Sequence, residues 1–312
     1  MDPDGALVRT RATVVVHGGR LVAERYGDRT DVWGQITGDP VDVDTPLISW
    51  SMAKSMLHAV VGMLVGEGRI ATDQPTGIDA WRGDGRSSIT VEQLLTMRDG
   101  LDFLEDYDPE VGSHVVDMLF GSGAADTAGF TIARPLGHEP GTVFNYSSGT
   151  SNVLSAIVRD LLGGEDAYRA FLHDRLFGPI GMTTADPRFD DAGTWIASSY
   201  VWATARDMAK FGSLYLRDGV WDGERLLPEG WVDHARRARS VDPDDDRLYG
   251  AHWWVTGDEH GTFWANGYEG QSILVSPALD LVVVRLGKST KDQYPALSDW
   301  RRRVVEAFAG AS

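Results

Sequence analysis

The stretch ISWSMAKSML, residues 48–57, decides the fold of this chain and carries its most reactive side chains. It contains Ser51 and Lys54, and an apolar run continues from it to Val65, which predicts a buried helix. Residues three apart on the first turn of a helix lie on one face. Burial would dehydrate the Lys54 ammonium and lower its pKa toward neutrality. A neutral amine beside a hydroxyl can accept the hydroxyl proton, which would make Ser51 an activated nucleophile.

The same stretch also fits a capped structural helix without catalytic function. A serine and a lysine at this spacing occur about once by chance in a chain of this length, judged from average residue usage. Two features favour catalysis: the chain has only four lysines, and lysines are rarely buried without a partner. The start of the helix would also offer free backbone N–H groups to a developing oxyanion.

Composition limits the classes of protein that the chain can represent. With 312 residues, 42% of them hydrophobic and 10% aromatic, it can bury a sizeable core in one large domain or two interleaved ones. The net charge of −17, without a basic cluster, argues against nucleic acid as a partner. The absence of cysteine excludes disulfides and thiol catalysis. No signal peptide and no membrane-spanning apolar run are visible, so we expect a soluble, cytoplasmic protein without a membrane partner.

Strand signals stand at both ends of the chain. Residues 10–17 and 20–26 flank Gly18-Gly19 and predict a β-hairpin. Residues 27–47 are expected to form a turn-rich connector. Near the C-terminus, short strands are expected at 262–266, 272–276 and 281–286, followed by a helix at 293–309.

Helices dominate the middle of the sequence. The helix that contains Ser51 is expected to end near residues 66–68, and Thr90 with Gln93 has the spacing of a capping box at the start of the next helix. Further helices are expected at 113–120, before Pro135, and at 150–162, 167–176 and 204–216.

The simplest architecture is an α+β fold in which one antiparallel sheet is built from both chain ends and flanked by helices, with a helical domain inserted. The sheet domain is expected to comprise residues 1–50 and 205–312, and the mainly helical domain residues 51–204. A catalytic cleft is expected between the two.

Three motifs follow one another in the order helix, loop and strand: Ser51-x-x-Lys54, YSS at residues 146–148, and WANGYEGQ at residues 264–271. On these motifs the chain resembles the serine β-lactamase and penicillin-binding-protein superfamily. It is most similar to the class C-like branch, where the second motif begins with tyrosine, and within it to the 6-aminohexanoate-dimer (nylon oligomer) hydrolases and related esterases. The stretches 200–207, 219–228 and 280–287 also resemble that group, so the likeness covers nearly the whole chain, and it implies a β-lactamase/transpeptidase-like fold.

The resemblance implies a catalytic role for each matched residue. Ser51 would be the nucleophile, and Lys54 would keep it activated. Tyr146 would pass a proton to the leaving group and later help to activate water. The backbone N–H groups of Ser51 and Tyr268 would form the oxyanion hole, in which one donor is typically worth ~3 kcal/mol.

Four further residues are expected at the substrate. Tyr107, in an acidic loop, matches a substrate-contacting tyrosine of the oligomer hydrolases, although an ordinary loop aromatic explains it equally well. Trp264, Asn266 and Gly267 of the third motif would line the same site.

The third motif departs from the pattern of many relatives, because Ala265 stands where they have lysine or histidine. The second motif has Ser148 where β-lactamases commonly have asparagine. Both differences make β-lactam or D-Ala-D-Ala chemistry a weaker expectation. The chain also begins almost directly at the first strand, without the longer leader of some relatives.

Other chemistries are not supported. The sequence contains no G-x-S-x-G elbow, no H-E-x-x-H and no phosphate-binding loop that ends in Gly-Lys-Ser/Thr. The acidic segment 242–247 lacks the glycine and later glutamate of a calcium loop. The eight histidines are scattered and are expected to be structural or exposed. Neither a metal nor a cofactor is therefore expected.

The sequence thus favours a serine hydrolase, an amidase or carboxylesterase, that acts on small amides or esters such as nylon-oligomer-like linear amides and short-chain esters. Acyl transfer at the same site and a weakly catalytic binding or sensor module remain open alternatives. The oligomeric state, including a homodimer, is not determined by the sequence.

Overall fold

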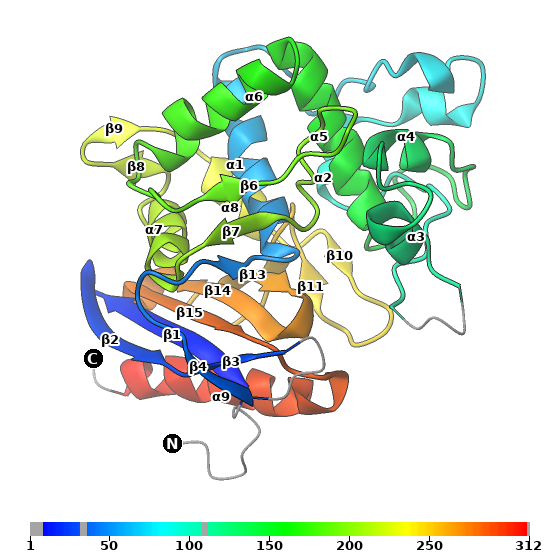
Figure 1. Ribbon diagram of the computed structural model, residues 1–312. Coiled ribbons are helices and arrows are strands. Elements are labelled where there is room, and N and C mark those ends of the chain that lie inside the picture. Colours follow the sequence, from blue (N-terminus) through cyan, green and yellow to red (C-terminus); the bar gives the residue numbers. More distant parts are fainter. Residues whose placement is uncertain (1–8, 32–35, 108–111, 311–312) are drawn as a thin grey trace.

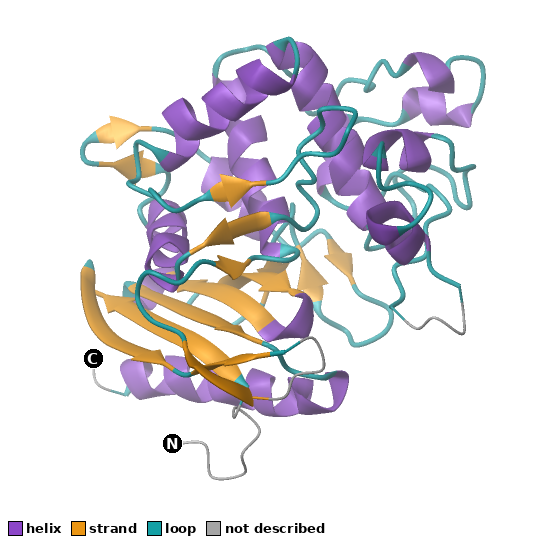
Figure 2. Cartoon of the chain, in the orientation of Figure 1, coloured by secondary structure: helices purple, strands orange, loops and turns teal. Residues whose placement is uncertain are grey.

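The computed structural model describes residues 9–31, 36–107 and 112–310. Figure 1 shows helices gathered above a curved sheet and one long helix, α9, packed below it. Figure 2 shows the same arrangement by type of secondary structure, with short strands and loops in the upper, mainly helical part. The fold is α+β, with a large antiparallel sheet flanked by helices, as the sequence predicted.

The strands are β1 (Thr10–His17), β2 (Arg20–Tyr26), β3 (Asp28–Thr30), β4 (Ile36–Pro40), β5 (Leu47–Ile48), β6 (Asp186–Pro187), β7 (Val201–Ala203), β8 (Val220–Trp221), β9 (Glu224–Arg225), β10 (Ser240–Val241), β11 (Leu248–Tyr249), β12 (Trp254–Val255), β13 (Phe263–Gly267), β14 (Gln271–Ser276) and β15 (Leu281–Gly287). The helices are α1 (Met52–Gly66), α2 (Val91–Leu95), α3 (His114–Phe120), α4 (Thr127–Ile132), α5 (Ser148–Leu162), α6 (Glu165–Phe171), α7 (Ala205–Leu216), α8 (Trp231–Arg236) and α9 (Tyr294–Ala309).

The main sheet joins the two ends of the chain. Its eight strands lie in the order β10-β11-β12-β13-β14-β15-β1-β2, and every neighbouring pair is antiparallel. The N-terminal hairpin β1–β2 attaches to the last strand, β15, with Val14 opposite Val284. The predicted sheet from both termini is therefore confirmed, while the predicted boundaries of two domains stay a prediction.

Successive side chains along the central strands point to opposite faces of the sheet and belong to two different hydrophobic cores. On β14, Ile273 and Val275 belong to the large core on the side of α1 and α7, whereas Leu274 faces the opposite core with Val305 of α9. On β13, Phe263 belongs to the first core and Trp264 to the second. A strand with both faces apolar is expected where helices cover both faces of a sheet.

Several predicted elements differ in detail from the structure. Residues 27–47 hold the short strands β3, β4 and the start of β5 rather than turns alone. Helix α5 begins at Ser148, two residues earlier than expected. After α6 the chain continues as a π-helix over Leu172–Phe177. Strands of two or three residues carry too few positions to show a periodicity, which explains why β5–β12 were not predicted.

Helix α1 is the central buried element, since every residue from Met52 to Leu64 is buried. It ends at Gly66, as predicted. The predicted cap of α2 is also present: Thr90 accepts from the Gln93 N–H, and the Gln93 side chain accepts from the Thr90 N–H. No helix among the described residues is long and apolar enough to cross a membrane; the location of the protein in the cell stays a prediction.

The close contact between α1 and α8 depends on Gly62. A Cβ atom added there would lie 2.2 Å from the indole nitrogen of Trp231, which itself donates a hydrogen bond of 2.9 Å to the His58 carbonyl. Replacing glycine by alanine inside a helix normally stabilises by about 1 kcal/mol. Here overpacking, which costs ~1 to 3 kcal/mol, should outweigh that gain.

We therefore expect Gly62→Ala to lower the midpoint of thermal unfolding measured by circular dichroism. Gly66→Ala in the same helix is the matched control, because its new methyl would meet Pro228 only at ordinary contact distances of 3.4 Å and more. A Gly62→Ala protein as stable as the Gly66→Ala protein would show that the α1–α8 packing is not tight.

Candidate active site

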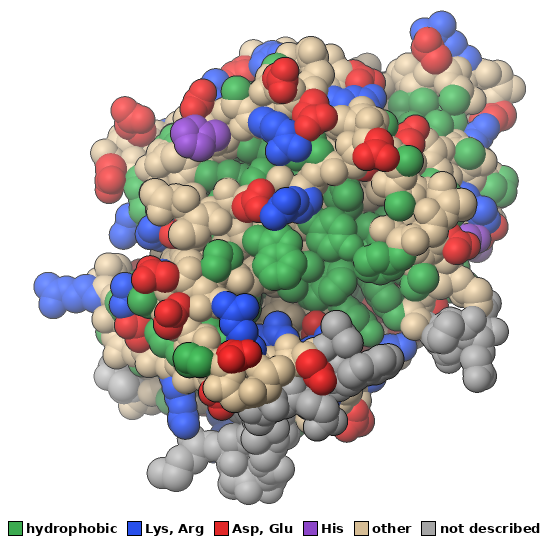
Figure 3. Space-filling view, in the orientation of Figure 1, with side chains coloured by type: hydrophobic (Ala, Val, Ile, Leu, Met, Phe, Trp, Pro, Cys, Tyr) green, Lys and Arg blue, Asp and Glu red, His purple; other side chains and the backbone are tan. Residues whose placement is uncertain are grey.

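A cleft of about 410 Å³ opens at the start of α1, where the helical part of the molecule meets the edge of β13. On the face drawn in Figure 3, hydrophobic side chains gather between the helices above and the sheet below. The cleft is lined by Ser51, Leu104, Glu105, Asp106, Tyr107, Phe144, Asn145, Tyr146, Asp242, Pro243, Asp244, Arg247, Trp254, Asn266, Gly267, Tyr268, Lys291 and Tyr294. The site therefore combines segments from the first helix, two loops and the sheet.

The Lys54 ammonium lies at the centre of the polar contacts below this cleft. Its Nζ donates to the Ser51 hydroxyl at 2.9 Å, to the Ser148 hydroxyl at 3.0 Å and to the Ser198 carbonyl at 3.0 Å. An ammonium has three donors, so these three acceptors satisfy it. The predicted helical spacing of Ser51 and Lys54 thus brings the amine to the hydroxyl.

The pKa of Lys54 is lowered to about 8, mainly because the side chain is buried. The Glu105 carboxylate opposes this effect and raises the pKa. Burial disfavours the charged form of a lysine, and a nearby anion favours it. The result is an amine that can change its protonation state near neutral pH, which is a property required of a general base.

Glu105 is a site residue that the sequence did not predict. Its carboxylate accepts from the Ser148 backbone N–H at 2.7 Å and from the Ser148 hydroxyl at 2.6 Å. Because the hydroxyl proton points to Glu105, a lone pair of the same oxygen can face Lys54. The negative charge also lies at the N-terminus of α5, where the helix dipole favours it. The sequence held no signal for Glu105, because it is one acid among several in the segment 99–112.

Tyr146 lies over the same lysine, with its ring centroid 4.9 Å from Nζ. Burial raises the pKa of Tyr146, and the Glu105 charge raises it further, while a hydrogen bond with the Ser51 hydroxyl lowers it. The phenol is therefore protonated at neutral pH and can donate. Trp254 packs against its ring with centroids 5.5 Å apart. The structure thus brings Ser51, Lys54 and Tyr146 together, as expected.

Strand β13 approaches the start of α1 very closely at Gly267. A Cβ atom there would lie 2.4 Å from the Ser49 carbonyl oxygen, so only glycine fits. The approach brings Tyr268 beside Trp50, with ring centroids 5.6 Å apart. Within residues 9–31, 36–107 and 112–310, no acceptor is found for the backbone N–H of Ser51 or of Tyr268.

The residues next to these two N–H groups have left-handed backbone conformations. Trp50 precedes Ser51 and has φ +46°, and Glu269 follows Tyr268 and has φ +60°. Such conformations cost of order 1–3 kcal/mol each outside glycine and often occur at functional sites. The two side chains are joined, because the Trp50 indole N–H donates to the Glu269 carboxylate at 3.3 Å.

Tyr107 stacks on Tyr268 with ring centroids 4.4 Å apart and lies in the cleft, where the sequence placed it. Asn266 and Gly267 line the cleft as well. Trp264 does not: it lies among the residues that line a second cavity next to α9. The expectation for Trp264 did not take into account the alternation along β13, which turns its indole to the core on the α9 side.

Cations and anions occur together around the cleft. Arg247 pairs with Asp245 at 2.6 Å and stacks on the Trp254 ring, 4.0 Å from its centroid. Lys291 pairs with Asp106 at 3.6 Å. The third motif has no cation of its own, but Arg247 and Lys291 reach the cleft from other segments.

One buried histidine supports the turn that carries Lys54. His252 lies with Nδ1 3.0 Å from the Lys54 carbonyl and Nε2 3.3 Å from the Ser151 hydroxyl. Burial, followed by the nearby Lys54 charge, lowers the pKa of His252 to about 3. The imidazole is therefore neutral, and its position fits a structural role, as expected for the histidines.

Comparisons with protein families, with known sequences and with solved structures all point to the same group of proteins. The β-lactamase family profile matches residues 8–307. A 6-aminohexanoate-dimer hydrolase from Paenarthrobacter ureafaciens is 31% identical over 300 residues, which cover 89% of this chain and 72% of that protein. Among solved structures, a candidate 6-aminohexanoate-dimer hydrolase from Bacillus anthracis has a TM-score of 0.79 at 24% identity, over 96% of this chain and 80% of that chain. A family VIII carboxylesterase has a TM-score of 0.70 at 17% identity, over 91% and 88%. Both structures support the fold.

The effect of the Glu105 carboxylate on the pKa of Lys54 can be tested by titration. In Glu105→Gln the anion that raises the pKa of Lys54 is lost while burial remains, so the pKa should fall below about 8. The measurement is a ¹³C NMR titration of protein labelled at lysine Cε. It is tractable because the chain has four lysines, and a Lys54→Met protein identifies the signal.

Glu269→Gln is the matched control. It removes a carboxylate that pairs with Lys288 but does not contribute to the pKa of Lys54. A Lys54 pKa that stays the same in both variants, or that moves equally in both, would contradict the assigned role of Glu105.

Proposed function

Because the chain belongs to the β-lactamase family, we propose that it is a serine hydrolase that cleaves small amides or esters through an acyl-enzyme on Ser51. The observation that carries the proposal is the set of three acceptors around Lys54: the Ser51 hydroxyl, the Ser148 hydroxyl and the Ser198 carbonyl. When the amine is neutral it keeps two donors for Ser148 and Ser198. Its lone pair then faces Ser51, the remaining neighbour.

Acylation follows from this arrangement. Neutral Lys54 accepts the hydroxyl proton as the Ser51 oxygen forms a bond to the substrate carbonyl carbon. The carbonyl oxygen becomes an oxyanion, for which the unpartnered N–H groups of Ser51 and Tyr268 are available donors. The bond to the leaving nitrogen or oxygen then breaks. Tyr146, protonated because its pKa is raised, gives that atom its proton and is reprotonated from Lys54.

Water completes the cycle by the same steps in reverse order. A water molecule takes the position of the departed group. Tyr146 accepts a proton from it and passes its own proton to neutral Lys54, while the water oxygen attacks the carbonyl carbon of the acyl-enzyme ester. The Ser51–acyl bond breaks, and the serine oxygen recovers a proton from Lys54. The cleft of about 410 Å³ is large enough for a small acyl group together with this water.

The aromatic lining favours a substrate with a short apolar chain. The aromatic residues Tyr107, Phe144, Trp254 and Tyr268 line the cleft together with charged residues such as Glu105, Arg247 and Lys291. Linear amides resembling nylon oligomers, and short-chain esters, match this description. The name of the Paenarthrobacter ureafaciens relative supports the first of these classes.

Ser51→Ala should abolish turnover, and a folded variant is expected because Ser51 is partly exposed at the helix start. The measurement is a time course with p-nitrophenyl acetate, p-nitrophenyl butyrate, a linear 6-aminohexanoate dimer and nitrocefin. We expect serine-dependent cleavage of esters or of the amide and no cleavage of nitrocefin. Unchanged turnover in Ser51→Ala would refute the nucleophile.

The alternative functions give different results in the same assay. A binding module would show no turnover, and mass spectrometry after incubation with a serine-directed phosphonate would find no adduct at Ser51. An acyltransferase would convert p-nitrophenyl butyrate mainly into a butyrate ester when an alcohol is added, with little free butyrate. The proposed hydrolase yields mainly the free acid.

The pKa of Lys54 predicts the pH dependence of acylation. Only the neutral amine can act as base, so kcat/KM for p-nitrophenyl butyrate should rise with pH through a midpoint of about 8 and then level off. The midpoint should move to lower pH in Glu105→Gln, because the loss of the anion lowers the pKa of the base. A profile governed by a group with the midpoint of a histidine, unaffected by Glu105→Gln, would exclude Lys54 as the base.

A further inference from the structure

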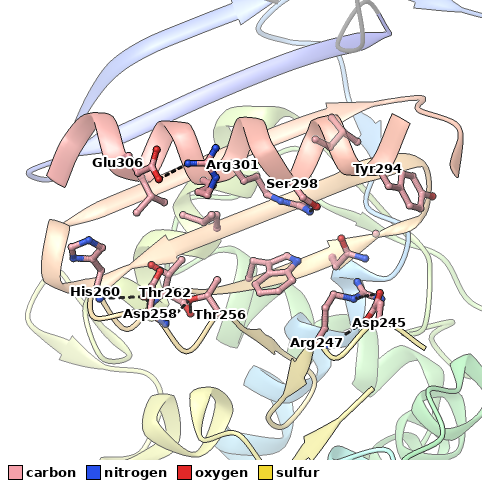
Figure 4. Close-up of a pocket in the computed structure, with 18 of the residues that line it drawn as sticks. Asp245, Arg247, Thr256, Asp258, His260, Thr262, Tyr294, Ser298, Arg301 and Glu306 are labelled. Carbon is pink, nitrogen blue, oxygen red and sulfur yellow. Dashed lines mark hydrogen bonds and ion pairs between the residues drawn. The ribbon is translucent and has the colours of Figure 1, made fainter. Parts of the chain in front are cut away.

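A second and larger cavity, of about 790 Å³, lies between α9 and the strands β12–β14. Figure 4 shows α9 above the strands, with side chains from both pointing into the space between them. Its lining is Asp245, Arg247, Thr256, Asp258, Glu259, His260, Thr262, Trp264, Asn266, Gly267, Gly270, Leu274, Tyr294, Leu297, Ser298, Arg301, Arg302, Val305 and Glu306. The size falls within the range of about 300–1,000 Å³ that is typical of small-molecule sites.

One wall of this cavity carries a buried donor without an acceptor. Trp264 is only 7% exposed, and its indole N–H has no hydrogen-bond partner among the described residues. A buried polar group without a partner costs free energy. Trp264 lines the cavity, and because its N–H is shielded from solvent, an acceptor atom bound there would satisfy it after a shift of the indole ring.

The opposite wall carries a cation without an ion pair. Arg302 pairs with Asp299 and Glu306, and Arg247 pairs with Asp242 and Asp245. For Arg301, the described part of the chain supplies a hydrogen bond to the Ser298 hydroxyl at 3.1 Å but no carboxylate.

The Arg301 guanidinium lies 5.7 Å from the centre of the Trp264 ring. Burial lowers the pKa of Arg301 to about 10, which is the effect of an environment that lacks a counter-ion. The cation and the free indole N–H therefore belong to one part of the cavity.

We propose that this cavity binds a small organic carboxylate with an apolar body. The carboxylate would accept from the Arg301 guanidinium, for which the described residues supply no carboxylate, and, after a shift of the indole ring, from the Trp264 N–H, for which they supply no acceptor. Leu274, Leu297 and Val305 provide apolar surface for the rest of the molecule. A single negative charge suffices, because the other lining arginines are already neutralised by acids.

The proposed site is separate from the cleft of Ser51 but shares a wall with it. Asn266, Gly267, Tyr294 and Arg247 line both spaces, whereas Ser51 and Tyr146 line only the cleft, and Trp264 and Arg301 only the cavity. The binding site therefore does not depend on the proposed hydrolase function.

The test uses the full chain and decanoate, below the concentration at which it forms micelles, in isothermal titration calorimetry. Ser51 is first blocked with a serine-directed phosphonate, or replaced by alanine if it does not react, so that decanoate cannot bind as a product on the serine. We expect saturable binding with one site and much weaker binding of 1-decanol, which has the same chain without the charge.

Arg301→Gln should weaken the binding of decanoate at least about tenfold, as expected for loss of a charged hydrogen bond. Arg303→Gln on the same helix is the matched control. It removes the same charge from a residue that does not line the cavity and pairs with Asp299, so affinity should be unchanged. Trp264→Phe keeps the aromatic volume and removes the N–H, and should also weaken binding.

Folding of the variants is checked by thermal unfolding without ligand. Arg301→Gln removes a cation whose pKa is lowered by burial, so no loss of stability is expected. Absence of saturable decanoate binding to the folded, serine-blocked protein would overturn the proposal. Equal affinity of wild type, Arg301→Gln and Arg303→Gln, or equal affinity for decanoate and 1-decanol, would do so as well.

Discussion

The burial of the Lys54 amine is the constraint on which the rest of the site depends. Helix α1 is buried from Met52 to Leu64, so the lysine on its first turn has no access to bulk water. The protein replaces that water by two hydroxyls and one carbonyl, which come from the residue before α1, from α5 and from the segment before β7. A charge in such a place is tolerated only if every donor is satisfied. Three segments far apart in sequence are thereby fixed around one nitrogen atom.

The Glu105 carboxylate counteracts the effect of burial on the pKa of Lys54. Without an anion, burial alone would lower the pKa of Lys54 further, and the amine would be a weaker base. The carboxylate acts without forming an ion pair with the lysine, since Ser148 stands between them and is bonded to both. The hydroxyl of Ser148 can serve both partners because it has one proton and two lone pairs. An asparagine side chain could also donate to Glu105 and accept from Lys54, but through its nitrogen and its oxygen rather than through one atom.

The sequence was sufficient to predict the features that depend on residues close to one another in the chain. The spacing of Ser51 and Lys54, the capping box of Thr90 and the glycine hairpin at residues 18–19 are local patterns with local causes. The order of three motifs was enough to identify the family, which the matching profile and relatives bear out. Glu105 could not be found in this way, because its role depends on a contact with Ser148 across 43 positions of sequence. To predict which side of the sheet Trp264 lies on, one would have to know which elements cover each face of β13.

The residues of β13 border two separate spaces, the cleft at Ser51 and the cavity next to α9. The glycine of this strand, Gly267, permits the contact with the Ser49 carbonyl that places Tyr268 beside Trp50. Three residues earlier, Trp264 points to the layer of α9, where the described residues supply no acceptor for its indole N–H and no carboxylate for the Arg301 guanidinium. The left-handed Glu269 closes the strand, and its carboxylate is held by Trp50 and Lys288. Because Asn266 and Gly267 border both spaces, the position of the backbone that presents the Tyr268 N–H depends on packing from the two sides of the sheet at once.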